Sequence, residues 1–167
     1  MTELREEIKE LEIVYRDECL VAVNKPNGLL VHRTRISDEK KLFALQILRD
    51  QVGKHVYPVH RLDRKTSGVL IFALNKNIYR QMQLKFSSGK VKKKYLAIVR
   101  GYTEDEGIID YPVKKDNGKL AEAITRYITL DKVEIDIPSG PHQTSRYSLV
   151  EVFPETGRMH QIRKHFA

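Results

Sequence analysis

A short apolar run at residues 69–73, VLIFA, is the strongest folding signal in the chain. Runs of this length that are rich in β-branched and aromatic side chains are typical of a buried strand. The preceding pair, Ser67-Gly68, predicts the turn that leads into it. Residues 60–65 are therefore expected to form a loop on the end of a core strand, where scaffolds commonly present functional side chains.

This loop holds one carboxylate, Asp63, among the cations Arg61, Arg64 and Lys65. Neighbouring cations favour the ionised form of a carboxyl group and attract polyanions. The same pattern is also typical of a solvated turn without a function, because charged turns mostly face solvent. The local pattern leaves both interpretations open.

Positive charge is concentrated around the loop. The 167-residue chain carries 30 Lys and Arg against 22 Asp and Glu, a formal net charge of +8. Residues 60–100 contain eleven of the cations and only one of the acids, so they supply more than the whole excess. Such a segment favours nucleic acid or another anionic surface as partner. Within it, the run KVKKK at 90–94 is either a solvated turn or a phosphate contact, and its place directly before a strand favours the contact.

Strand and helix signals predict an α+β fold. One helix is expected to follow a cap at Ser37 and to end at Gly53, a second to follow a cap at Asn75, and a third to begin near His160. The acidic segment 103–107 is expected to be an exposed turn. Strands outnumber helices, which favours a mixed, largely antiparallel sheet with packed helices. The expected strands are 11–15 and 19–23 as a hairpin, then 69–74, 95–99, 123–130, 133–137 and 147–152.

The length indicates one domain, which we expect to span residues 11–167 after an N-terminal extension at 1–10. The single cysteine, Cys19, rules out a disulfide framework within the chain, and the charged first ten residues do not resemble a signal peptide. A cytoplasmic protein is therefore expected. No apolar run approaches the ~20 residues of a membrane span. The histidine spacings fit no metal site and no phosphate-binding glycine motif is present, so neither a metal nor a nucleotide cofactor is expected.

Three motifs resemble the RluA family of pseudouridine synthases: HRLDRKTSG at 60–68, KKYLAIVRG at 93–101 and TGRMHQIR at 156–163. They occur in the family's order, and LVAVNKPNGLLVH at 20–32 is similar to its usual opening. The resemblance covers about residues 11–167 and implies the pseudouridine synthase fold. It is closest to a branch of the family that acts on tRNA. Relatives continue beyond a helix like the one expected near His160, so the resemblance implies a catalytic domain that is incomplete at its C-terminus.

The resemblance also implies an isomerase that converts uridine to pseudouridine in RNA. Asp63 would be the nucleophile, which divides a difficult step into two. The target base is stacked and must be flipped out. Arg61 would hold the gap in the RNA open, Tyr95 would lie against the flipped base, and Arg163 would form an ion pair with Asp63.

The implied partner is RNA, with a T-stem uridine of tRNA as the favoured target and large-subunit rRNA as the alternative. A catalytically inactive RNA-binding relative is the rival class of protein. The protein is expected to be a monomer that binds no membrane. The candidate RNA-binding residues are Arg61, Arg64, Lys65, Lys92, Lys93 and Lys94.

Overall fold

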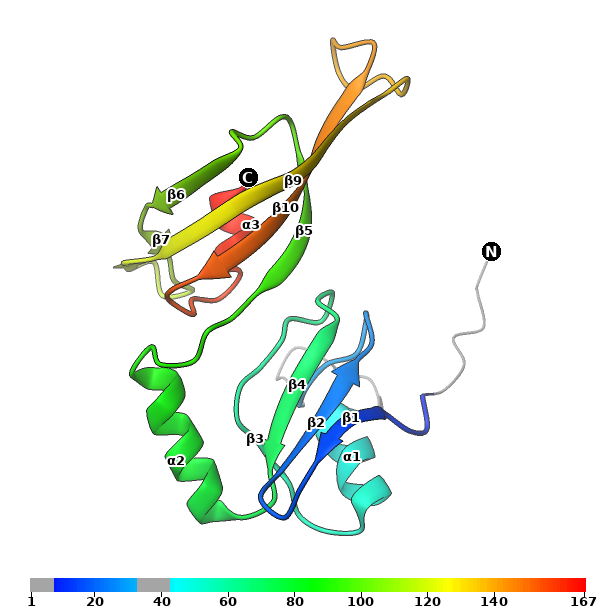
Figure 1. Cartoon of the computed structure of the whole chain (residues 1–167), viewed down its shortest axis with the longest axis vertical. Helices are drawn as coiled ribbons and strands as arrows, with labels where there is room; N and C mark the ends of the chain where they lie inside the picture. The colour runs from blue at the N-terminus through cyan, green and yellow to red at the C-terminus, as the bar shows by residue number, and fades with distance from the viewer. Residues whose placement is uncertain (1–7, 33–42) are drawn as a thin grey trace. The chain divides into compact units, whose positions relative to one another are not determined.

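The computed structural model describes residues 8–32 and 43–167, which fall into two compact units that meet between Ser88 and Gly89. Each unit has its own four-stranded sheet (Figure 1). Every strand pair in the described ranges is antiparallel. The division of the chain into an extension at 1–10 and a domain at 11–167 stays a prediction.

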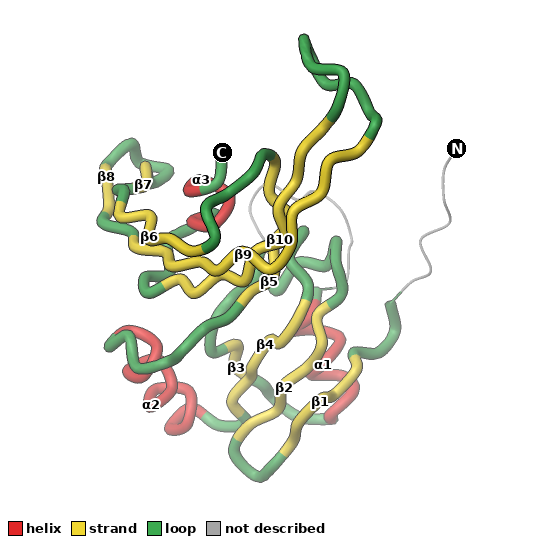
Figure 2. The backbone as a smooth tube through the Cα atoms, turned by 45° about the horizontal axis from the view of Figure 1, so that its top comes forward, coloured by secondary structure: helices red, strands yellow, loops and turns green. Residues whose placement is uncertain are grey.

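The first unit contains a sheet with the strand order β1-β2-β4-β3 and two helices. In the core, Val21 of β2 faces Phe72 of β4 and Val23 faces Leu70, and none of these four side chains has exposed surface. Helix α1 lies on one face of the sheet, as Figures 1 and 2 both show. The elements are β1 (Glu12–Arg16), β2 (Leu20–Lys25), α1 (Ala44–Val52), β3 (Tyr57–Pro58), β4 (Gly68–Ala73) and α2 (Lys76–Ser87).

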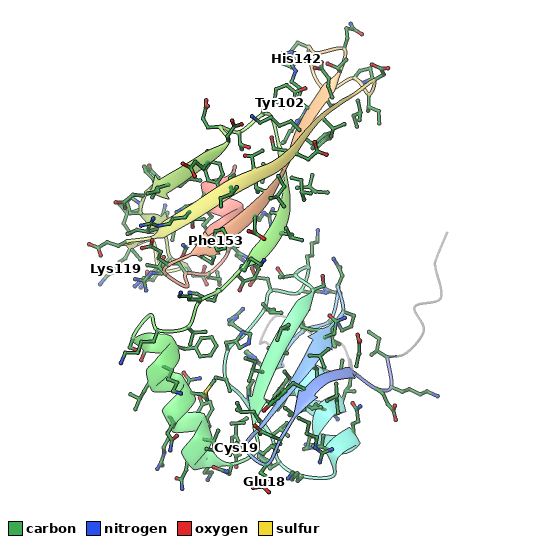
Figure 3. All side chains as sticks on the ribbon, in the orientation of Figure 1. Glu18, Cys19, Tyr102, Lys119, His142 and Phe153 are labelled. Carbon is green, nitrogen blue, oxygen red and sulfur yellow. The ribbon has the colours of Figure 1, made fainter. Side chains whose placement is uncertain are left out.

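Local signals placed most of these elements. The predicted hairpin at 16–18 is confirmed, and Cys19 lies at that turn in Figure 3, where its backbone N–H donates to Asp17 Oδ1 at 2.7 Å. The predicted cap Asn75 accepts from the backbone N–H of Ile78 at 2.9 Å. Gly53 ends α1 in the left-handed conformation, at φ 68°. The predicted cap Ser37 lies outside the described residues.

The second unit pairs its four long strands in the order β5-β10-β9-β6 and adds a small hairpin, β7-β8. Val99, Val150 and Val152 form its buried core, and Ile162 of the C-terminal helix packs against them. The elements are β5 (Tyr95–Arg100), β6 (Glu106–Asp110), β7 (Val113–Lys114), β8 (Leu120–Ala121), β9 (Ile124–Ile135), β10 (Ser145–Pro154) and α3 (Gln161–His165).

One prediction for this unit was wrong, and another was correct only in part. The strands expected at 123–130 and 133–137 are one strand, β9, because its pairing with β10 continues through a bulge between Leu149 and Val150. The turn expected at 103–107 is present at residues 103–105, but Glu106 and Gly107 belong to β6, where Gly107 pairs with Tyr127. A Cβ on Gly107 would lie 2.7 Å from the Tyr127 ring, so this strand position requires glycine.

Candidate active site

The loop before β4 is held at both of its ends. His60 Nε2 accepts from the backbone N–H of Ile71 at 3.2 Å. Leu62 is buried and anchors the middle of the loop. The backbone N–H of Thr66 donates to the Asp63 carbonyl at 3.0 Å and closes a tight turn. Asp63 itself is half-buried, so its carboxyl group is positioned by the scaffold without being sealed from solvent.

The cations beside Asp63 point outward. Arg61, Arg64 and Lys65 are all exposed. Within the described ranges, Arg64 bonds through its Nε, which donates to the Gly28 carbonyl at 3.1 Å. The rest of its guanidinium therefore stays available to an anion. RNA contact by these three cations stays a prediction, with which their exposure agrees.

The turn at 25–28 holds this loop in place through hydrogen bonds. The backbone N–H of Gly28 donates to the Arg64 carbonyl at 2.8 Å, and Asn27 Nδ2 donates to the Lys65 carbonyl at 2.9 Å. Gly28 adopts φ 87°, a conformation that glycine reaches without steric cost. The KPNG sequence at 25–28 thus builds a rigid support for the residues that flank Asp63.

Lys25 is a site residue that the sequence reasoning missed. Its side chain is fully buried, and Nζ donates to the carbonyls of Leu29 at 2.8 Å, Pro26 at 2.9 Å and Arg64 at 3.3 Å. Burial lowers the pKa of Lys25, whereas the negative charge of Asp63 acts in the opposite direction. The buried ammonium and the candidate nucleophile therefore interact electrostatically.

The alternation of side chains along β2 is the sequence feature that predicts a buried position for Lys25. Side chains two residues apart on a strand share a face, so Val21, Val23 and Lys25 of β2 point to the same side. Val21 and Val23 form the core, which places Lys25 in the interior as well. A lysine at a core position of a strand indicates a buried cation with dedicated partners.

The second unit holds the other two predicted catalytic residues. Tyr95 is the first residue of β5, pairs in register with Val152 and is half-buried against the core of this unit. Arg163 lies on α3 and is exposed. Asp63 belongs to the first unit, so the expected ion pair between Arg163 and Asp63 stays a prediction.

Gln161 fixes the start of α3 and was also missed. It is buried, and its Oε1 accepts from Thr156 Oγ1 at 2.7 Å and from the backbone N–H of Arg158 at 2.9 Å. Its Nε2 donates to the Ile124 carbonyl at 3.0 Å and to Thr125 Oγ1 at 2.9 Å. Four partners satisfy the full capacity of a carboxamide.

The hydrogen bonds of Gln161 matter because α3 is too short to be stable by itself. It is five residues long, and its N-cap, His160, has φ 55° and makes no side-chain cap bond. Isolated helices of this length are unstable in water. Gln161, with the packing of Ile162, therefore determines where Arg163 stands, two residues along the helix.

The three lysines at 92–94 have different surroundings. Lys92 is exposed. Lys93 Nζ donates to the Thr156 carbonyl at 3.0 Å, and burial lowers its pKa. Lys94 forms an ion pair with Glu151 at 2.8 Å. RNA contact by these lysines stays a prediction, and Lys92 has the least competition from partners within the chain.

Other chemistries find little support in the described part of the chain. No three His, Cys, Asp or Glu side chains gather there into a possible metal site. None of the helices described combines the length and the apolar character that crossing a membrane requires.

The chain matches one protein family over most of its length. The RNA pseudouridylate synthase family matches residues 19–167, a range that includes the loop, β5 and α3. The chain is 51% identical over 166 residues to tRNA pseudouridine synthase C of Haemophilus ducreyi, covering 93% of this chain and 68% of that protein. It is 49% identical over 169 residues to the protein of the same name from Vibrio parahaemolyticus, covering 95% and 69%.

Solved structures share the fold. Human RNA Pseudouridylate Synthase Domain Containing 4 matches with a TM-score of 0.71 and 30% identity, over 92% of this chain and 62% of that one. Human RNA Pseudouridylate Synthase Domain Containing 1 matches with a TM-score of 0.75 and 25% identity, over 96% and 65%. The chain belongs to the RNA pseudouridylate synthase family, with the α+β fold expected from the sequence. It spans about two thirds of the length of these relatives.

Proposed function

We propose that this chain isomerises uridine to pseudouridine in tRNA. The observation that carries the proposal is Asp63, half-buried on a loop clamped by Lys25 and Gly28, in a chain of the RNA pseudouridylate synthase family. The relatives at about half identity are named for tRNA, which favours tRNA over large-subunit rRNA. The reaction would take place in the cytoplasm, with the protein as a monomer.

The reaction rearranges one nucleotide and needs no second substrate. The bond between ribose C1′ and uracil N1 breaks, the base turns, and a bond forms between C1′ and C5. C5 loses its proton and N1 gains one, so atoms and electrons balance. Asp63 supplies the carboxylate that acts as nucleophile.

The other site residues would act around this step. Arg61, exposed beside Asp63, occupies the space that the flipped uridine leaves in the RNA. Tyr95 lies against the flipped base. Arg163 pairs with Asp63 and holds its carboxyl group in position.

Release of tritium from tRNA labelled at uracil C5 tests the proposal. The parent chain should release tritium, and Asp63→Asn should release none while it still binds tRNA, because the substitution removes the nucleophile and keeps the shape of the side chain. Asp116→Asn, in the exposed loop between β7 and β8, is the matched control and should react like the parent. Full activity of Asp63→Asn would contradict the proposed role.

Two further outcomes separate the alternatives. Release from large-subunit rRNA but not from tRNA would keep the reaction and change the substrate. Binding of tRNA without release by the parent chain would favour a catalytically inactive RNA-binding relative.

A further inference from the structure

The solvent-exposed half of α2, called its outer face below, carries positive charge without any negative charge. Lys76, Arg80 and Lys85 are all exposed on this helix. The helix contains no Asp or Glu, and the sequence has none between Asp63 and Glu104. Surface helices of soluble domains usually mix charges of both signs, so a single sign over a whole helix indicates an anionic partner.

These cations are not explained by the stability of the helix. Lys76 is the first residue of α2, where the positive end of the helix dipole disfavours a cation. Arg80 follows at i+4, and like charges at this spacing repel. Only Lys85, in the last turn, is favourably placed for the dipole. In the described ranges, none of the three forms an ion pair.

Helix α2 is attached directly to the residues that lead into the active-site loop. The ring of Phe86 stacks on His60, with ring centroids 5.1 Å apart and planes 16° apart. Gln83 Nε2 donates to the Val59 carbonyl at 2.6 Å. The outer face of α2 is therefore held at a fixed position relative to Asp63 within the same unit.

We propose that Lys76, Arg80 and Lys85 form a docking surface for the phosphate backbone of the substrate RNA, separate from the cations beside Asp63. This inference rests on the proposed function for the identity of the RNA. Nine residues of helix place Lys76 and Lys85 ~13 Å apart along the axis and on opposite edges of the exposed half of α2, with Arg80 beside Lys76. That length is several times the ~3.4 Å that one duplex strand advances per phosphate, so the cations contact different phosphates. Contacts of this kind position the RNA and read no base.

The test is the salt dependence of tRNA binding by the triple variant Lys76→Gln, Arg80→Gln, Lys85→Gln. Each lost phosphate contact lowers the slope of log affinity against log salt by about 1. The triple variant should therefore bind unmodified tRNA with a slope smaller by about 2 to 3. At saturating tRNA its kcat should equal that of the parent, and its KM should be higher.

Folding of this variant is checked by thermal unfolding. Glutamine is a good helix former, and removal of the like charges relieves repulsion, so Tm should stay the same or rise. The matched control is Lys54→Gln, Lys115→Gln, Lys119→Gln, which removes three exposed cations elsewhere. Lys119 is labelled in Figure 3, on the β7-β8 hairpin. The control should keep the parent slope, and an equal slope in all three proteins, or an equal fall in both variants, would overturn the docking surface.

The docking surface and the proposed reaction can fail separately. Tritium release by the parent, together with an unchanged slope in the α2 variant, would overturn the surface and keep the reaction. A smaller slope in the α2 variant, with no tritium release by the parent, would keep the surface and contradict the reaction. Absence of tRNA binding by the parent would overturn the surface.

Discussion

The two units fix their candidate catalytic residues with different kinds of buried side chain. In the first unit, the support of the Asp63 loop is a buried cation, Lys25. In the second unit, the support of α3 and Arg163 is a buried neutral amide, Gln161. Both side chains bond to backbone groups from separate segments, but only Lys25 interacts electrostatically with the residue that it supports.

The difference follows the charge of the residue that each unit presents. A buried cation near a carboxylate favours the ionised form that a nucleophile needs. A buried charge near Arg163 would either repel its guanidinium group or neutralise it. A neutral amide with four hydrogen-bond partners holds the helix without adding a charge. The comparison therefore predicts that loss of Lys25 changes both geometry and electrostatics, and that loss of Gln161 changes geometry alone.

The largest effect on turnover in this comparison is expected for Lys25→Met. The substitution keeps an unbranched side chain of similar shape but leaves buried carbonyls without a donor, which should lower the free energy of unfolding by about 2 kcal/mol. Displacement of the Asp63 loop should lower kcat on the order of 100-fold. Urea unfolding and single-turnover kinetics measure the two effects, with the exposed Lys54→Met as control. Parent-like kcat in Lys25→Met would show that the loop does not depend on its clamp.

The pH dependence of stability isolates the charge of Lys25. Its pKa is lowered in the folded state. Between that lowered pKa and the ordinary value of 10.5, the unfolded chain binds a proton that the folded chain does not. Stability of the parent should therefore rise with pH across this window. The rise should be smaller in Lys25→Met.

A smaller loss of turnover is expected for Gln161→Met, because in the proposed reaction Arg163 would assist and would not form the new bonds. The free energy of unfolding should fall by about 2 kcal/mol, since buried partners such as Thr125 and the Arg158 N–H lose their bonds. The fall in kcat should be on the order of tenfold, with the exposed Gln81→Met as control.

Gln161→Glu tests whether the hydrogen bonds of Gln161, and not only the space that its side chain fills, hold α3 in place. The new carboxylate would face the Ile124 carbonyl, which can only accept, so the pKa of that carboxyl group should be raised in the folded state. Stability of this variant should rise as pH falls through the raised pKa, because the protonated group can donate again. If the free energy of unfolding of this variant depends on pH as that of the parent does, the four hydrogen bonds of Gln161 do not hold α3 in place.

The smallest effect is expected where a charge is paired at the surface. Lys132 Nζ pairs with Asp105 at 2.8 Å, and the Asp105 side chain is almost fully exposed. Exposed pairs of this kind contribute little, so Lys132→Gln should change Tm by less than about 2 °C. A larger change would mean that surface charge, and not only buried polar anchors, determines the stability of the second unit.

The sequence predicted what short-range chemistry specifies. The turn at 16–18, the cap at Asn75 and the end of α1 at Gly53 follow from side chains within four residues of each position. The loop before β4 was predicted for the same reason, because a buried strand must be entered by a turn. The family motifs singled out Asp63, Tyr95 and Arg163 as candidates, and their roles stay predictions.

The features that were missed depend on partners far along the chain. Gln161 bonds to Ile124 and Thr125, 37 and 36 residues away, and nothing within its own motif indicates these contacts. The continuity of β9 depends on its pairing with β10. The burial of Lys25 could have been predicted from the sequence, because alternation along β2 places it beside Val21 and Val23 in the core.

The most direct test of the central claim is nucleoside analysis of unmodified tRNA after incubation with the parent chain or with Asp63→Asn. Complete nuclease digestion followed by chromatography separates pseudouridine from uridine. The parent should convert one uridine at a defined position, and Asp63→Asn should leave every uridine unchanged although it binds the same tRNA. Pseudouridine formed by Asp63→Asn at the parent rate would contradict the account.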